Sequence, residues 1–142
     1  MLRRTIFIPL AILMSLAAKP GFAEDALPTD TFKSIISHQL QAIAKDDAAT
    51  AYEDAAPLVR QLFQTPDIFM NMVRSGYPPV YRNKQFVFDN AGTDPNGRPY
   101  QKVELFGLDG TMYDAIYYMQ QQPDGTWKIS GCVVAKAEGQ TA

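Results

Sequence analysis

The spacing of the hydrophobic positions changes once along the chain, from a helical period to an alternating one. Residues 29 to 77 place apolar side chains at helical spacing, and residues 85 onward alternate apolar with polar side chains. One face of a first helix is formed by Phe32, Ile36, Leu40 and Ile43. A helical half followed by hairpin-linked strands predicts an α+β domain. We expect N-terminal helices packed on a curled four-stranded antiparallel sheet, as a half-open cone.

Turn formers and capping residues divide residues 29–76 into several helices. Ser, Thr, Asp and Asn cap helix N-termini, and proline suits the first helical position. The expected cap and first-turn residues are Thr29 or Asp30, Asp46 or Asp47, Pro57, Thr65 and Pro66. Gly76 is expected to end the last of these helices.

Residues 77–84 join the helical half to the sheet half, residues 85–136, and residues 137–142 form a tail. Pro78 and Pro79 predict a stiff, extended joint, because each proline disfavours the α region for the residue before it. Asp109-Gly110 predicts a hairpin. The residues expected to face inward from the strands are Phe86, Phe88, Gln101, Val103, Leu105, Ala115, Tyr117, Met119, Trp127, Ile129, Gly131 and Val133.

The first 23 residues have the composition of a signal peptide. Arg3 and Arg4 precede an uncharged apolar run over residues 5–18, which is shorter than the roughly 20 residues that span a bilayer. Small residues at Gly21 and Ala23 predict cleavage between Ala23 and Glu24. We therefore expect a periplasmic or secreted domain, residues 24–142, with no stable membrane anchor after cleavage. The general secretory route is favoured, and the twin-arginine route stays open.

The composition of residues 24–142 argues against nucleic acid as a partner. Removing Arg3, Arg4 and Lys19 from the 13 basic residues leaves 10, against 15 acidic residues, a net charge of −5. A protein with this negative charge is not attracted to nucleic acid or to an anionic membrane. The single cysteine, Cys132, makes no internal disulfide and is expected to be a small buried hydrophobic residue, with a reactive thiol as the alternative.

The motifs "SHQLQAIAKDDAATAYEDAAP", F-x-T-P-x-x-F-x-x-M-V-x-x-G-Y-P-P-V-Y-R and "DGTWKISGC" occur in this order. From about Ile36 to Cys132 the chain resembles the DUF4864 family of short exported bacterial proteins, which is classed as a domain of unknown function. The arrangement also looks like the nuclear-transport-factor-two-like, cystatin-like cone class, which includes ketosteroid isomerase. The first resemblance implies export without an assigned activity, and the second implies a fold.

Acid–base chemistry has few candidates in this sequence. Cone-class enzymes place an Asp, His or Tyr in an apolar cavity, where desolvation tunes the pKa of that side chain. His38, the only histidine, is expected to face solvent. Asp114 is a weak catalytic candidate, because it would face outward and pair with Lys102 or Lys128.

Metal binding has less support still. One His and one Cys cannot form a zinc site. Met70 and Met72 diverge on a helix, with Met72 expected to pack beside Ile68 and Val73. We expect no metal and no cofactor.

The expected cone leaves room for a binding function. Its wall would be formed by Phe86, Phe88, Val103, Leu105, Tyr117, Met119, Trp127 and Ile129. The candidate ligand-binding residues are Gln39, Tyr77, Tyr81, Arg82, Gln101 and Tyr117. An apolar wall with sparse polar anchors is typical of small-molecule sites, and it is also typical of an ordinary filled core.

Three functions remain open. The favoured one is a non-catalytic exported binding or accessory protein that holds a small apolar ligand between the first helix and the sheet. The alternatives are a small acid–base enzyme and a dimeric structural or assembly module. The dimer would pair through the outer sheet face at Met112, Ile116 and Tyr118.

Overall fold

The computed structural model describes residues 26–138, so the expected signal peptide, its cleavage site and residues 139–142 lie outside the described residues. Five helices come first: α1 (Thr29–Ala44), α2 (Ala48–Glu53), α3 (Pro57–Leu62), α4 (Pro66–Gly76) and α5 (Pro78–Tyr81). Four strands follow: β1 (Gln85–Thr93), β2 (Pro99–Phe106), β3 (Met112–Gln121) and β4 (Trp127–Lys136). In residues 26–138, no helix combines the length and the apolar character needed to cross a membrane.

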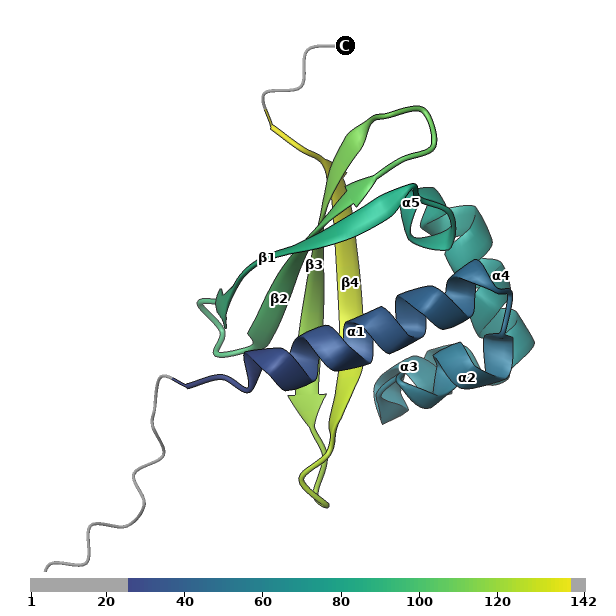
Figure 1. Cartoon of the computed structure of the whole chain (residues 1–142). Helices are drawn as coiled ribbons and strands as arrows, with labels where there is room; N and C mark the ends of the chain where they lie inside the picture. The colour runs from purple at the N-terminus through teal and green to yellow at the C-terminus, as the bar shows by residue number, and fades with distance from the viewer. Residues whose placement is uncertain (1–25, 139–142) are drawn as a thin grey trace, which may run out of the picture.

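The strands form one open antiparallel sheet in the order β1-β2-β3-β4, and α1 crosses one of its faces (Figure 1). Helices α2, α3 and α4 gather beyond the β4 edge of the sheet, and α5 lies at the start of β1 (Figure 1). The α+β, cone-like fold predicted from the change of period is therefore confirmed.

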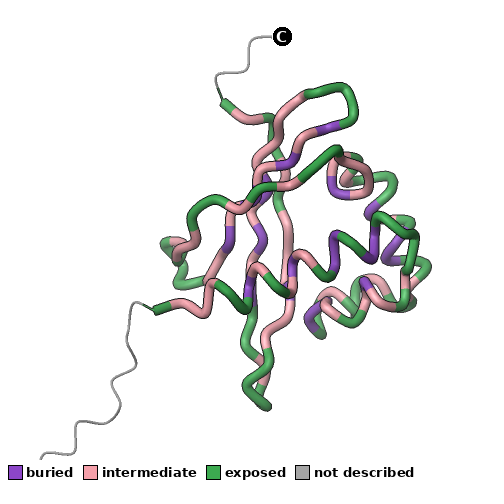
Figure 2. Tube along the Cα trace, in the orientation of Figure 1, coloured by how far each residue is buried: buried purple, intermediate pink, exposed green. Residues whose placement is uncertain are grey.

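The core lies between α1 and the sheet, where the predicted helical stripe is buried (Figure 2). Phe32, Ile36 and Ile43 have no exposed surface, and Phe32 meets the Trp127 ring edge-on with ring centroids 4.9 Å apart. The sheet contributes Val103, Leu105, Ala115, Tyr117, Met119 and Ile129, all buried. Alternation along β2 and β3 thus identified the inward face correctly.

Most predicted caps are confirmed. Asp47 accepts a hydrogen bond from the Thr50 N–H at the start of α2, and Thr65 accepts one from Ile68 at the start of α4. Pro57 and Pro66 begin their helices. The prediction for α1 is wrong, because Pro28 occupies the cap position and no side chain caps this end.

The prediction of an extended Tyr-Pro-Pro joint is also wrong. Tyr77 leaves the α region as expected, with φ −136° and ψ 59°, but residues Pro78–Tyr81 form the short helix α5. Both prolines occupy its first turn. There their fixed φ fits a helix and their missing N–H groups need no partner.

A bulge in β4 corrects the predicted inward face of that strand. Tyr118 pairs with Gly131 and Met119 with Ile129, so Ser130 is an extra residue. Beyond it the alternation shifts by one position. Val133, expected inside, is 56% exposed, whereas Cys132 is partly buried against the core.

Met70, and not Met72, is the fully buried methionine of α4. Met70 is 2% exposed and packs in the core with Phe69 and Val73, whereas Ile68 is 49% exposed. Met72 is only partly buried. The buried face of α4 is therefore rotated away from the face predicted for it.

Candidate functional site

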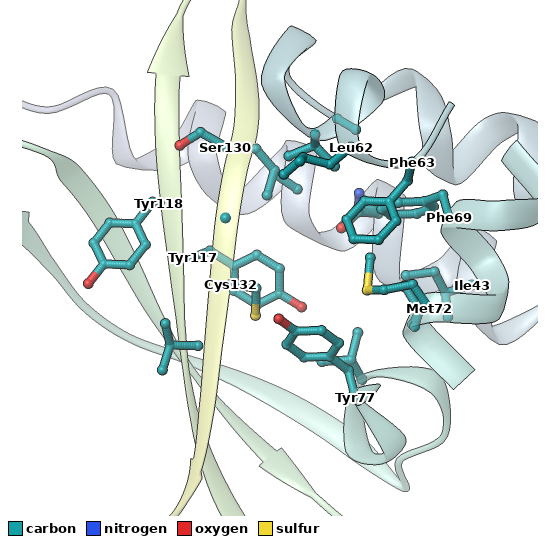
Figure 3. A pocket seen from close by; sticks show the side chains of 18 of the residues that line it. Ile43, Leu62, Phe63, Phe69, Met72, Tyr77, Tyr117, Tyr118, Ser130 and Cys132 are labelled. Carbon is teal, nitrogen blue, oxygen red and sulfur yellow. The ribbon is translucent and has the colours of Figure 1, made fainter. Parts of the chain in front are cut away.

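A cavity of about 470 Å³ lies between strand β4 and helices α3 and α4 (Figure 3). Its wall is mainly apolar. The apolar lining residues are Ile43, Ala55, Val59, Leu62, Phe63, Phe69, Met72, Val73, Val80, Ile129, Gly131 and Val133. The remaining lining residues are Gln39, Tyr77, Arg98, Tyr117, Tyr118, Ser130 and Cys132.

The cavity does not lie at the position expected between α1 and the centre of the sheet. That space is filled by core side chains from α1, Phe32 and Ile36 among them. Of the eight residues expected in the wall, Tyr117 and Ile129 line the observed cavity. The cavity is displaced to the β4 edge, where the smaller helices form its other side.

Backbone pairing at the β4 edge holds the helical side of the cavity in place. The Ile129 N–H donates to the Asp54 carbonyl and the Ala56 N–H donates to the Ile129 carbonyl, both at 2.8 Å. These bonds make a short parallel bridge between the α2–α3 loop and β4. Tyr52 adds a tether, because its hydroxyl donates to the Phe63 carbonyl at 2.6 Å.

Tyr117 and Cys132 are two of the polar groups on the sheet side of the cavity. They are partners in the β3–β4 register, and both side chains point toward the helices (Figure 3). Burial raises the pKa of the Cys132 thiol to about 12. Burial, with a smaller effect of Cys132, raises the pKa of Tyr117 well above its usual value. Both groups therefore keep their protons at neutral pH.

Gln39 and Tyr77, both predicted ligand-binding residues, also line the cavity. The Gln39 side chain is 4% exposed and donates to the Ala51 carbonyl at 3.2 Å. Tyr77 lies between α4 and α5, and its hydroxyl points toward that of Tyr117 (Figure 3). Three of the six candidate residues, Gln39, Tyr77 and Tyr117, are thus brought together in the wall of the cavity.

Gln101 lies elsewhere. It is fully buried, and its amide donates to the Asp89 carbonyl at 2.7 Å and to the Lys102 carbonyl at 2.9 Å. The β1–β2 register shifts between Phe88 and Ala91, so the bond to Asp89 serves a carbonyl group at a bulge. Gln101 stabilises the sheet and does not line the cavity.

Tyr81 and Arg82 also lie away from the cavity, because they bind Asp46 at the end of α1. The Tyr81 hydroxyl donates to Asp46 Oδ1 at 2.6 Å, and Arg82 Nη2 lies 2.7 Å from Oδ2. Arg74 Nη2 lies 3.2 Å from Oδ1. The Tyr81 hydrogen bond, with further bonds from Arg74 and Arg82, lowers the pKa of Asp46 from 3.8 to about 2. The cluster therefore ties α4 and α5 to α1.

Replacing Asp46 by Asn is expected to lower stability at neutral pH and to flatten its dependence on acid. Asp46 has φ 53°, a conformation that Asn tolerates, so the substitution removes mainly the charge. A carboxyl with a lowered folded pKa stabilises above pH 3.8, and this contribution is lost as the pH falls toward 2. Urea unfolding at pH 7 and pH 2 measures it. Equal differences between the two proteins at both pH values would contradict this assignment.

His38 and Asp54 form an ion pair that the sequence did not indicate. His38 Nδ1 lies 2.5 Å from Asp54 Oδ2, although 16 residues separate them. The hydrogen bond with Asp54 raises the pKa of His38, whereas burial raises the pKa of Asp54. The His38 ring is half exposed, so its predicted exposure is right and its partner was missed. The pair joins α1 to the loop that pairs with β4.

The titration of His38 is expected to respond to Asp54. Because the folded pKa of His38 is raised, its contribution to stability is present below pH 6.5 and is lost as the pH rises through the folded value. His38 is the only histidine, so its ring protons give one NMR titration curve in untagged protein. Asp54→Asn should lower the pKa of His38. An unchanged curve would show that the pair does not form in solution.

Asp114 lies on the outer face of the sheet, paired with Lys102 as predicted. Lys102 Nζ is 3.7 Å from Asp114 and 3.4 Å from Asp89. Ile116 and Tyr118 share this face and are partly exposed, and Arg98 stacks over the Tyr118 ring at 4.0 Å. Asp114 does not line the cavity. Within residues 26–138, no group of three or more His, Cys, Asp or Glu side chains is placed to hold a metal ion.

Comparison with known proteins gives a family but no activity. No curated protein matches the chain significantly. Residues 26–142 match the family model described as "Domain of unknown function (DUF4864)". The match includes every helix and strand described above.

Proposed function

The chain belongs to the DUF4864 family, and we propose that it is an exported, non-catalytic binding protein whose cavity beside β4 holds a small apolar molecule. The cavity carries this proposal. Its volume of about 470 Å³ lies within the roughly 300–1,000 Å³ typical of ligand pockets. Apolar walls with few polar groups are likewise typical of small-molecule sites.

The ionisable groups near the cavity favour binding over acid–base catalysis. Tyr117 and Cys132 keep their protons at neutral pH, so neither is a ready base there. Asp114, the catalytic candidate from the sequence, is engaged by Lys102 on the other face of the sheet. A protein that holds its ligand without transforming it accounts for this arrangement.

The wall of the cavity is partly exposed to solvent on the side of α3. Leu62 is 68% exposed at its rim, and Val59, Phe63 and Met72 are partly exposed. The short helix α3 that carries Val59 and Leu62 is tied to β4 through the loop before it. A ligand can enter from this side without disturbing the core beneath α1.

Nile red tests the binding proposal, because this neutral dye fluoresces strongly when it leaves water for an apolar site. Titration of the purified protein should give saturable binding with one molecule per chain. A response that never saturates would contradict the proposal. The mass of the protein recovered from the periplasm tests export, with Glu24 expected as the first residue and an intact N-terminus as the contrary result.

A further inference from the structure

The Tyr117 hydroxyl is a buried polar group without an oxygen or nitrogen partner. Tyr117 is 1% exposed, and the described residues offer its hydroxyl no hydrogen-bonding group apart from the Cys132 thiol. A thiol is only a weak hydrogen-bonding group, so the hydroxyl stays largely unsatisfied. A buried hydroxyl without a partner is destabilising, because it has lost its hydrogen bonds to water. Because Tyr117 lines the cavity, a ligand atom bound there could supply the missing hydrogen bond.

The charge around Tyr117 restricts what that atom can be. Among residues 26–138, Arg98 is the only charged residue that lines the cavity. Its guanidinium is bound to Asp94 at 2.9 Å and stacks over Tyr118, whose side chain lies on the other side of β4 from Tyr117 (Figure 3). An anionic ligand group beside Tyr117 would therefore be buried without a cation, which is unfavourable. The site favours a neutral ligand.

Tyr77 provides a second donor. Its hydroxyl points toward the Tyr117 hydroxyl (Figure 3) and makes no hydrogen bond with residues 26–138. The Tyr77 side chain is partly exposed. A ligand oxygen that binds the Tyr117 hydroxyl would lie on the side toward which Tyr77 points, where Tyr77 can donate a second hydrogen bond (Figure 3).

We infer that the ligand is a neutral apolar molecule with one acceptor oxygen, such as a ketone, and that Tyr117 donates to this oxygen. The inference rests on the proposed function and names its ligand class. It distinguishes the protein from a carrier of fatty acids or other apolar carboxylates. Tyr117 binds the ligand in this account and has no catalytic role.

Three naphthalene probes of similar size test the ligand class by isothermal titration calorimetry. 2-Acetylnaphthalene carries a neutral acceptor oxygen, 2-ethylnaphthalene lacks it, and 2-naphthoate is an anion. Tyr117→Phe removes only the hydroxyl. We expect this variant to bind the ketone about five- to tenfold more weakly than the wild type, while its affinity for the hydrocarbon is unchanged or higher. The anion should bind the wild type at least about tenfold more weakly than the ketone.

The possible failures are distinguishable. If Tyr117→Phe weakens ketone and hydrocarbon equally, the substitution acts through cavity shape and the inference is overturned, although the proposed function stands. If the anion binds as tightly as the ketone, the inference is likewise overturned and the proposed function stands. If the wild type binds none of the three probes, the proposed function itself is contradicted.

A ligand-free measurement gives an independent readout. Removing an unpartnered buried hydroxyl should raise the melting temperature of Tyr117→Phe above that of the wild type, by about 3 °C or more. Tyr113→Phe is the matched control, because this tyrosine is only partly buried on the same strand. A lower melting temperature for Tyr117→Phe would show that the hydroxyl already has a partner in the free protein, which overturns the inference.

Discussion

Val59→Trp is expected to abolish Nile red binding while the protein stays folded. Val59 lines the cavity from α3 and is only partly buried, so an indole at this position fills the cavity and leaves the core beneath α1 in place. A ligand that has lost its space loses the apolar contacts that hold it. We expect affinity to fall about 100-fold or more, which corresponds to about 2.7 kcal/mol. Fluorescence titration measures the loss, and circular dichroism verifies the fold.

The adjacent residue supplies the matched control. Leu58 lies on the same short helix, is 58% exposed and does not line the cavity. Leu58→Trp introduces the same side chain one position away and should bind Nile red as the wild type does. Equal binding by both variants would mean that the dye occupies another surface.

Phe32→Ala is expected to be the most destabilising single substitution discussed here. Phe32 has no exposed surface and packs against Trp127 at the start of β4. Truncating a buried Phe removes apolar contacts and leaves a void, at a typical cost of about 3–5 kcal/mol. That is a large fraction of the roughly 5–15 kcal/mol that stabilises a small domain. Urea unfolding monitored by Trp127, the only tryptophan, measures the change.

Ile68→Ala is the control for this substitution. Ile68 is 49% exposed on α4, so its truncation should cost less than about 1 kcal/mol. If Phe32→Ala costs no more than Ile68→Ala, the packing of α1 on the sheet is not the main source of stability. The packing of α1 on the sheet would then not explain why the core and the cavity are separate.

Local sequence patterns predicted the parts of the fold that local physics decides. The stripe through Phe32 and Ile36 has the period of a helix face, and it is buried as expected. Asp47 and Thr65 cap helices as predicted. Capping depends only on a side-chain oxygen and a free backbone N–H a few residues away, so the sequence reveals it. Alternation along β2 identified Val103 and Leu105 as buried.

Long-range pairing decides the features that sequence patterns missed. The extra residue at Ser130 depends on how β4 pairs with β3, and it reverses the faces of Cys132 and Val133. The cavity lies at the β4 edge because the loop at Ala55 pairs with Ile129, more than 70 residues later in the chain. The first turn of α5 accommodates both prolines, an outcome that the residue-by-residue rule for X-Pro did not anticipate.

The candidate binding residues divide in the same way. Gln39 and Tyr117 are candidates as polar groups near an apolar interior, and both line the cavity. Tyr77 and Arg82 are candidates from their place in the Tyr-Pro-Pro segment; Tyr77 lines the cavity, but Arg82 is bound to Asp46, 36 residues earlier. Sequence alone does not reveal such a partner.

NMR contacts between a bound probe and the protein test the central claim most directly. With 2-acetylnaphthalene bound, nuclear Overhauser effects should join the probe protons to the methyl groups of Val59, Leu62 and Ile129, which line the cavity from α3 and β4. Contacts to Ile116 on the outer sheet face in place of these methyl groups would contradict a ligand site in the cavity beside β4.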